Sequence, residues 1–185
     1  MKLTAVKKSI YCAICIALCY VLPLAFHAIG AGSVLLPMHI PVLICGLVCG
    51  WQFGMLCGIS GPAISCILTS MPTVADLPSM MVELCLYGVV AATIMKIVRT
   101  QNTYADLYIS VIVAIVVGRI ASGFVRALIF TTGEYSMALW VSSYVITSWP
   151  GTIIQLAIIP SIVFALMKAG FMPDRYPKEI EEEEE

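Results

Sequence analysis

The feature that most limits how this chain can fold is a long stretch without charge. From Ser9 to Ala75 there is no Asp, Glu, Lys or Arg, and further apolar blocks follow as far as Lys168. Hydrophobic residues make up 61% of the sequence and charged residues only 11%, whereas charged residues are about a quarter of an average soluble domain. The sequence therefore predicts an all-α integral membrane protein.

We predict six transmembrane helices, over residues 9–26, 37–50, 53–70, 78–95, 107–130 and 139–167. Only a slight break at Trp51 and Gln52 separates the second and third blocks, and the second block is short for a bilayer crossing. Merging these two blocks would place Lys96 and Arg99 opposite the amino-terminal lysines, against the positive-inside rule. Six crossings instead put both termini in the cytoplasm with Lys2, Lys7, Lys8, Lys96, Arg99, Lys168, Arg175 and Lys178.

The chain is predicted to form one six-helix transmembrane domain over residues 1–170, followed by a disordered acidic cytoplasmic tail over residues 171–185. The first block imitates a signal peptide, because Lys7 and Lys8 precede its apolar core. We expect it to be retained, since that core is long for a signal peptide and its removal would leave an odd number of crossings. The sequence has no G-x-x-x-x-G-K-[ST] loop, so we do not expect it to hydrolyse ATP by itself.

The eight cysteines raise the possibility of a metal or redox site, and Cys12 and Cys15 have the C-x-x-C spacing. All eight lie within apolar spans, where a thiol behaves as a small hydrophobic group. We predict that they pack the interior, with no metal site and no disulfide framework.

A second pattern, Gly58-Ile59-Ser60-Gly61, fits the sequence around the serine of rhomboid-type intramembrane proteases. Such a serine needs a histidine base, and in rhomboids that histidine follows the serine in the chain. Both histidines of this chain, His27 and His39, precede Ser60. We therefore do not expect an enzyme, and we expect the small residues to allow close contact between helices.

Charged residues inside the spans indicate a site, because each costs about 2.5–3.5 kcal/mol at the bilayer centre unless the protein shelters it. Glu83 and Arg126 are predicted to lie at a similar depth below the outer surface. Arg119 shares a helical face with Arg126 and lies two turns deeper. Two interpretations stay open: these arginines contact a ligand, or one of them forms a structural ion pair with Glu83.

Further polar and aromatic residues extend this inward-facing surface. Tyr87 follows Glu83 by one helical turn, and the last span carries Tyr144, Ser148 and Gln155 at helical spacing, with Trp149 adjacent. Three helices then point polar groups inward in the outer half of the membrane, which predicts a small-molecule pocket open to the outside. His39 and Trp140 are candidate members of this pocket or ordinary interfacial residues.

The first span carries small residues every fourth position, namely Ala5, Ser9, Ala13 and Ala17. These side chains stack along one helical face, where another helix can approach closely. That helix is either a partner protein's or one of this chain's own.

Several segments resemble the substrate-binding S components of energy-coupling factor (ECF) vitamin transporters. The matching segments are Leu36-Pro37-Met38-His39-Ile40-Pro41-Val42 with Gly46, Gly50, Gly54, Gly58 and Pro62, then Met71-Pro72, Pro78-Ser79-Met80-Met81-Val82-Glu83-Leu84 with Tyr87-Gly88, and Gly118-Arg119-Ile120 with Gly123. Their order and spacing within a six-span frame carry the resemblance.

The resemblance implies a multi-pass protein of a bacterial plasma membrane that binds a vitamin or vitamin precursor on its outer side. Its partners would be a transmembrane coupling protein and two ATPase subunits, with no cofactor and no nucleic acid. In that family an A-x-x-x-A face on the first helix meets the coupling protein, and Ala13 and Ala17 match it. The chain looks similar to the pantothenate type, and the arginines suit an anionic vitamin, whereas Glu83 suits a cationic compound such as a thiamine or queuosine precursor.

Overall fold

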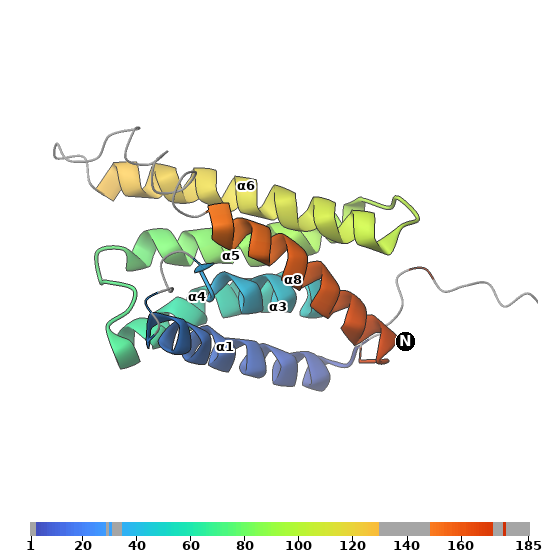
Figure 1. The fold of residues 1–185 in the computed structure, drawn as a ribbon, viewed down its shortest axis with the longest axis horizontal. Helices are drawn as coiled ribbons and strands as arrows, with labels where there is room; N and C mark the ends of the chain where they lie inside the picture. Colours follow the sequence, from blue (N-terminus) through green and yellow to red (C-terminus); the bar gives the residue numbers. More distant parts are fainter. Residues whose placement is uncertain (1–2, 29, 31–34, 130–148, 172–175, 177–185) are drawn as a thin grey trace, which may run out of the picture.

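The protein is a bundle of α-helices, seen in a computed structural model that describes residues 3–28, 30, 35–129, 149–171 and 176. The described helices are α1 (Ala5–Ala28), α3 (His39–Cys49), α4 (Trp51–Thr69), α5 (Leu77–Ile97), α6 (Thr103–Ile129) and α8 (Trp149–Lys168). Helix α6 runs along one side of the bundle and α1 along the other, and α8 crosses obliquely between them (Figure 1). No strand occurs in these residues, which confirms the predicted all-α class.

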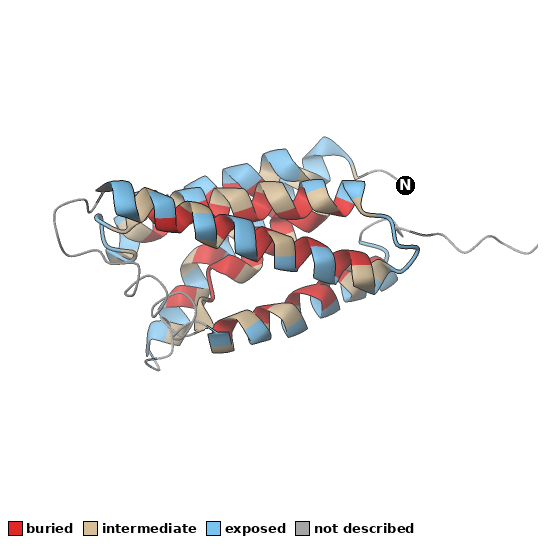
Figure 2. Cartoon of the chain, turned by 90° about the horizontal axis from the view of Figure 1, so that it is seen from above, coloured by how far each residue is buried: buried red, intermediate tan, exposed pale blue. Residues whose placement is uncertain are grey.

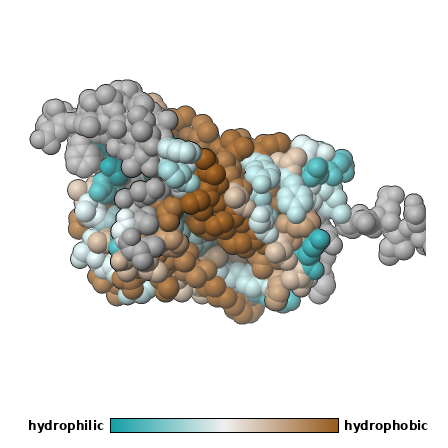
Figure 3. Space-filling view, viewed as in Figure 1, coloured by the Kyte–Doolittle hydropathy of each residue, from teal (hydrophilic) through white to brown (hydrophobic). Residues whose placement is uncertain are grey.

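Five of the six described helices are long and apolar enough to cross a membrane, and α3 is the exception. With 11 residues, α3 is about 16 Å long at 1.5 Å per residue, well short of a hydrocarbon core of about 30 Å. Apolar side chains cover the middle of the face drawn in Figure 3, and strongly hydrophilic ones lie near its two ends. The chain is therefore a multi-pass membrane protein, with five helices of spanning length among those described.

The second and third predicted spans are separate helices that fold back on each other at Gly50. This residue has φ of +98°, a left-handed conformation that glycine adopts most readily. Its N–H donates to the carbonyl of Gly46, and its own carbonyl accepts from Gly54. The predicted break at Trp51 and Gln52 was wrong in position, because both residues belong to the first turn of α4.

Glycines bring the backbones of α3, α4 and α5 into direct contact. A Cβ atom on Gly54 would lie 2.8 Å from the Cα of Gly46 and 2.8 Å from the carbonyl oxygen of Gly88. A Cβ on Gly58 would lie 2.5 Å from the backbone of Leu84. The small residues around position 58 therefore serve close helix contact, as the sequence predicted.

Helix α1 presents two different faces. Its buried residues are Cys12, Cys15, Cys19 and Pro23. Its small residues Ala5, Ser9, Ala13 and Ala17 are all exposed. The small-residue face therefore does not pack against the described helices, which removes the interpretation that it contacts helices of this chain within those residues.

Both described ends of the chain lie at the same end of the bundle (Figure 1). The hydroxyl of Tyr11, early in α1, donates to the carbonyl oxygen of Phe171, just after α8, over 3.3 Å. At this same end, Tyr176 donates to Asp106 over 2.6 Å, and Asp106 also accepts from Thr100 in the loop after α5. We refer to this end as the terminal end of the bundle and to the other as the distal end.

Candidate functional site

A buried polar cluster is centred on Glu83 of α5. The hydroxyl of Tyr87, one turn along the same helix, donates to Oε1 of Glu83 over 3.1 Å. Nε2 of His39, at the start of α3, lies 3.6 Å from the same oxygen, and the hydroxyl of Ser122 on α6 also bonds to the carboxyl group. All four side chains are buried (Figure 2 shows buried residues along the inward faces of the helices).

Arg119 extends this cluster from α6 to α8. Its guanidinium donates to the hydroxyl of Thr152 over 2.7 Å and bonds to the hydroxyl of Tyr87. The Tyr87 ring lies directly against Gly118, where a Cβ atom would collide with it. One chain of polar contacts thus joins α3, α5, α6 and α8 in the interior of the bundle.

Among the described residues, Glu83 is sheltered by two hydroxyl donors and a histidine. A buried carboxylate must be paired or hydrogen-bonded to avoid a large desolvation cost, and His39, Tyr87 and Ser122 meet that need. The prediction that the polar residues of these spans face one another in the interior is confirmed for Glu83, Tyr87 and Arg119.

Arg126 pairs with Asp76 instead of with Glu83. Its NH1 lies 2.9 Å from Oδ1 of Asp76, and the two side chains are 26% and 35% exposed. Arg126 lies in the last turn of α6, whereas Glu83 lies six residues inside α5. The expectation that Arg126 and Glu83 lie at the same depth was wrong. Arg126 lies level with Asp76, just before the first residue of α5, and Glu83 lies about two helical turns deeper.

Two buried side chains carry polar atoms that lack a hydrogen-bond partner among the described residues. Both Nε2 and Oε1 of Gln155 on α8 are in this position, although the residue is fully buried. Nδ1 of His39 is also buried without a partner. Natural interiors satisfy the large majority of such atoms. A bound ligand with its own donors and acceptors is one physical explanation for their presence.

A small cavity of about 150 Å³ reaches His39 from the distal end of the bundle. It lies between the end of α1 and the segments before α3 and α5, and His27, Met38, Met71 and Met80 line it together with His39. His39 also lies 3.6 Å from Glu83, so it is the residue that this cavity shares with the polar cluster. Of the predicted pocket residues only His39 lines this cavity, so the predicted pocket between α5, α6 and α8 stays a prediction.

The remaining predicted site residues divide into two groups. Tyr144, Ser148 and Trp140 lie outside the described residues, so their part in the site stays a prediction. Trp149 is 57% exposed at the first residue of α8, so it is not one of the buried side chains of the cluster. Asp76 and Thr152 were not predicted as partners of the two arginines. Thr152 precedes Gln155 by one turn and could have been found from that spacing.

The cysteines form part of the core. Six of them are buried, in α1, α3 and α4: Cys12, Cys15, Cys19, Cys45, Cys49 and Cys57. All eight are free thiols. No group of three or more His, Cys, Asp or Glu side chains is arranged to hold a metal ion in the part of the chain that the structure describes.

Ser60 has no histidine partner of the kind a nucleophilic serine requires. Its hydroxyl donates to the carbonyl of Leu56, one turn earlier in α4, over 2.6 Å. The buried histidine, His39, contacts Glu83 instead. Ser60 is thus an ordinary helical serine whose hydroxyl is hydrogen-bonded to the backbone of its own helix.

The fold defines a multi-pass membrane protein with a buried polar cluster. A family model for the substrate-specific component of ECF transporters matches residues 7–172, and the chain belongs to this family. This membership makes the chain a substrate-binding subunit of an ECF transporter. Members of this family are transport proteins, not enzymes. No curated protein and no solved structure matches the chain significantly.

Proposed function

We propose that this protein captures a vitamin or vitamin precursor outside a bacterial plasma membrane and delivers it inward. A transmembrane coupling protein and two ATPase subunits would supply the energy, since the sequence has no phosphate-binding loop. The family match over residues 7–172 is the observation that carries this proposal.

The substrate would bind near the distal end of α3, α5, α6 and α8, in contact with Gln155 and His39. These two residues hold the buried polar atoms that lack partners among the described residues. A small molecule with amide or hydroxyl groups would satisfy them, and a site built to hydrogen-bond its substrate rejects analogues that lack those groups. The region includes the other predicted site residues Glu83, Tyr87, Arg119 and Arg126, and Tyr144, Ser148 and Trp149 stay candidates on the sequence pattern alone.

We favour an anionic substrate such as pantothenate over a cationic one such as a thiamine or queuosine precursor. The sequence argument for a cation rests on Glu83, yet this carboxylate is 3% exposed and already contacts His39 and Tyr87. Arg126 is 26% exposed at the distal end and can be reached from the surface. Pantothenate also carries an amide and two hydroxyl groups, which suit the amide of Gln155.

The exposed small-residue face of α1 is our candidate for contact with the coupling protein. Ser9, Ala13 and Ala17 lie one helical turn apart and point away from the core. Small side chains allow two helices to approach closely in a membrane, where packing rather than the hydrophobic effect drives association.

We also propose that the terminal end of the bundle is cytoplasmic. Five basic residues lie at this end: Lys7, Lys8, Lys96, Arg99 and Lys168. At the distal end, Arg126 is paired with Asp76.

Single cysteines at Val74 and Asn102 test this orientation in intact cells. A membrane-impermeant maleimide should label position 74 and spare position 102. The reverse pattern would invert the proposed orientation.

A thermal-shift screen of the purified protein tests the substrate. Pantothenate should raise the melting temperature, whereas thiamine should not. Uptake in cells should then require the coupling protein and both ATPases. Uptake by this chain alone would contradict the proposed S-component role.

A further inference from the structure

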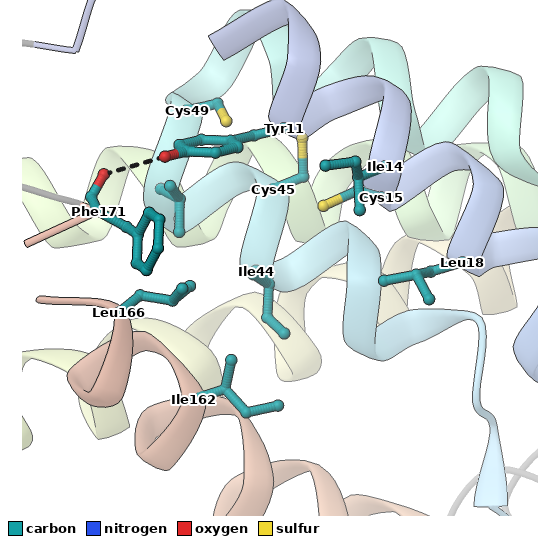
Figure 4. A pocket seen from close by; sticks show the side chains of 11 residues that line it. Tyr11, Ile14, Cys15, Leu18, Ile44, Cys45, Cys49, Ile162, Leu166 and Phe171 are labelled. Carbon is teal, nitrogen blue, oxygen red and sulfur yellow. Dashed lines mark hydrogen bonds between the residues drawn. The ribbon is translucent and has the colours of Figure 1, made fainter. Parts of the chain in front are cut away.

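A second cavity lies far from the polar cluster, near the terminal end of the bundle. It is a groove of about 350 Å³ between α1, α3 and α8. Aliphatic side chains such as Ile44 and Ile162 form its walls, with thiols and the rings of Tyr11 and Phe171 (Figure 4). The hydroxyl of Tyr11 is turned to the carbonyl oxygen of Phe171, so the groove presents hydrocarbon and sulfur to an occupant.

The groove and the small-residue face lie on different sides of α1. Tyr11, Cys15 and Leu18 line the groove at spacings of four and three residues, which places them on one helical face. At 100° per residue, Ala13 and Ala17 point roughly to the opposite side. A partner that binds the small-residue face therefore leaves the groove open to the bilayer.

Positive charge continues the groove toward the membrane surface. Lys7 and Lys8 precede Tyr11 by four and three residues, so they follow the same face of α1. Lysines beside an apolar groove at the end of a spanning helix match the charge of an anionic lipid headgroup.

We propose that this groove binds one acyl chain of an anionic phospholipid, with Lys7 and Lys8 at its phosphate. A volume of about 350 Å³ lies in the range of small-molecule sites, and an acyl chain is the hydrocarbon that surrounds the protein. Inside a bilayer, hydrocarbon gains little by moving from lipid to protein. Selectivity for this lipid must therefore come from the two lysines and from the shape of the groove.

Native mass spectrometry of the delipidated full-length protein tests the site, with phosphatidylglycerol and phosphatidylcholine as titrants. One phosphatidylglycerol should bind saturably, about five- to thirtyfold tighter than phosphatidylcholine if each lysine contributes as basic residues do near membranes. Replacing both lysines (Lys7→Gln, Lys8→Gln) should remove that preference. A preference unchanged by the double substitution would overturn the headgroup assignment.

A groove-filling substitution tests the acyl chain separately. Ile162→Trp should abolish the saturable binding of both lipids. Ile158→Trp is the matched control, because Ile158 lies one turn earlier on α8, is 38% exposed against 39% for Ile162, and is outside the groove lining. Ile44→Phe fills the groove from α3 and covers the case in which Ile162→Trp fails to fold. The proposal would be overturned if both groove variants still bound lipid. It would also be overturned if the parent protein formed a dimer without lipid and the groove substitutions abolished that dimer.

Discussion

Two buried clusters meet at helix α3 and are built from opposite chemistry. Around His39 and Glu83, strong donors and acceptors from four helices bind one another, yet Gln155 and Nδ1 of His39 have no partner among the described residues. Around Cys19 and Cys57, whose sulfur atoms lie 4.0 Å apart, the thiols pack against each other and against backbone carbonyls. The polar cluster thus leaves buried atoms without partners among the described residues, and we propose that a ligand completes it, whereas the thiols of the second cluster contact one another and nearby carbonyls.

This difference separates the scaffold from the site. In the thiol cluster, Cys12 and Cys45 both direct their sulfur atoms to the carbonyl of Phe53, at 3.7 and 3.4 Å. Such weak contacts make few demands on geometry and hold α1, α3 and α4 together. In the polar cluster, unpartnered atoms cost free energy when buried, and binding of a substrate would recover that cost.

The largest effect should come from the small-residue face, which belongs to neither cluster. Ala13→Leu or Ala17→Leu should abolish uptake and co-purification with the coupling protein, because a bulky side chain prevents close helix approach. Substrate binding by the isolated protein should stay nearly unchanged. Loss of binding together with loss of assembly would show that this face supports the fold, and so would place it with the scaffold.

The next largest effect should be a loss of stability in the scaffold. In Gly88→Ala, the new Cβ would lie 2.5 Å from the backbone of Gly54, and overpacking of this kind costs about 1–3 kcal/mol or more. The apo melting temperature should fall clearly. Gly61→Ala is the control, since its Cβ would meet only the side chain of Cys19, at 3.0 Å. Equal melting of the two variants would contradict the backbone contact between α4 and α5.

Most of the scaffold could be predicted from the sequence because it depends on local composition. Apolar blocks fixed the helices, and charge in a lipid environment forced Glu83 and Arg119 to face the interior. The pairings could not be predicted, because they depend on how helices are offset along their axes. Close contact between glycines of α3 and α5 fixes the offset at which His39 contacts Glu83. The segment before α5 places Asp76 beside Arg126.

Arg126 offers a test of the boundary between site and scaffold. Arg126→Gln should weaken pantothenate binding about ten- to hundredfold, the loss expected for a charge-assisted hydrogen bond of about 1.5–3 kcal/mol. Its pair with Asp76 is partly exposed, so the apo protein should lose no more than about 1 kcal/mol of stability. Isothermal calorimetry and apo melting measure the two quantities.

The control for this prediction is Asp76→Asn, which breaks the same ion pair but keeps the guanidinium. Affinity should be retained or increased in that variant, because Arg126 keeps its charge for the ligand carboxylate. If both variants lower the melting temperature alike and neither changes affinity, the pair is structural and Arg126 is not a ligand contact.

The most direct measurement compares one residue from each cluster, Gln155→Leu and Cys57→Ala, by apo melting temperature and by substrate affinity. Gln155 is fully buried and its amide atoms have no partner among the described residues, so leucine should leave melting unchanged or raise it. Affinity should fall roughly two- to tenfold as one hydrogen-bonding group is lost. Cys57→Ala should lower melting by leaving a cavity beside Cys19 and leave affinity unchanged. A Gln155→Leu protein that melts lower yet binds substrate as the parent does would contradict our central claim that the polar cluster is completed by the ligand.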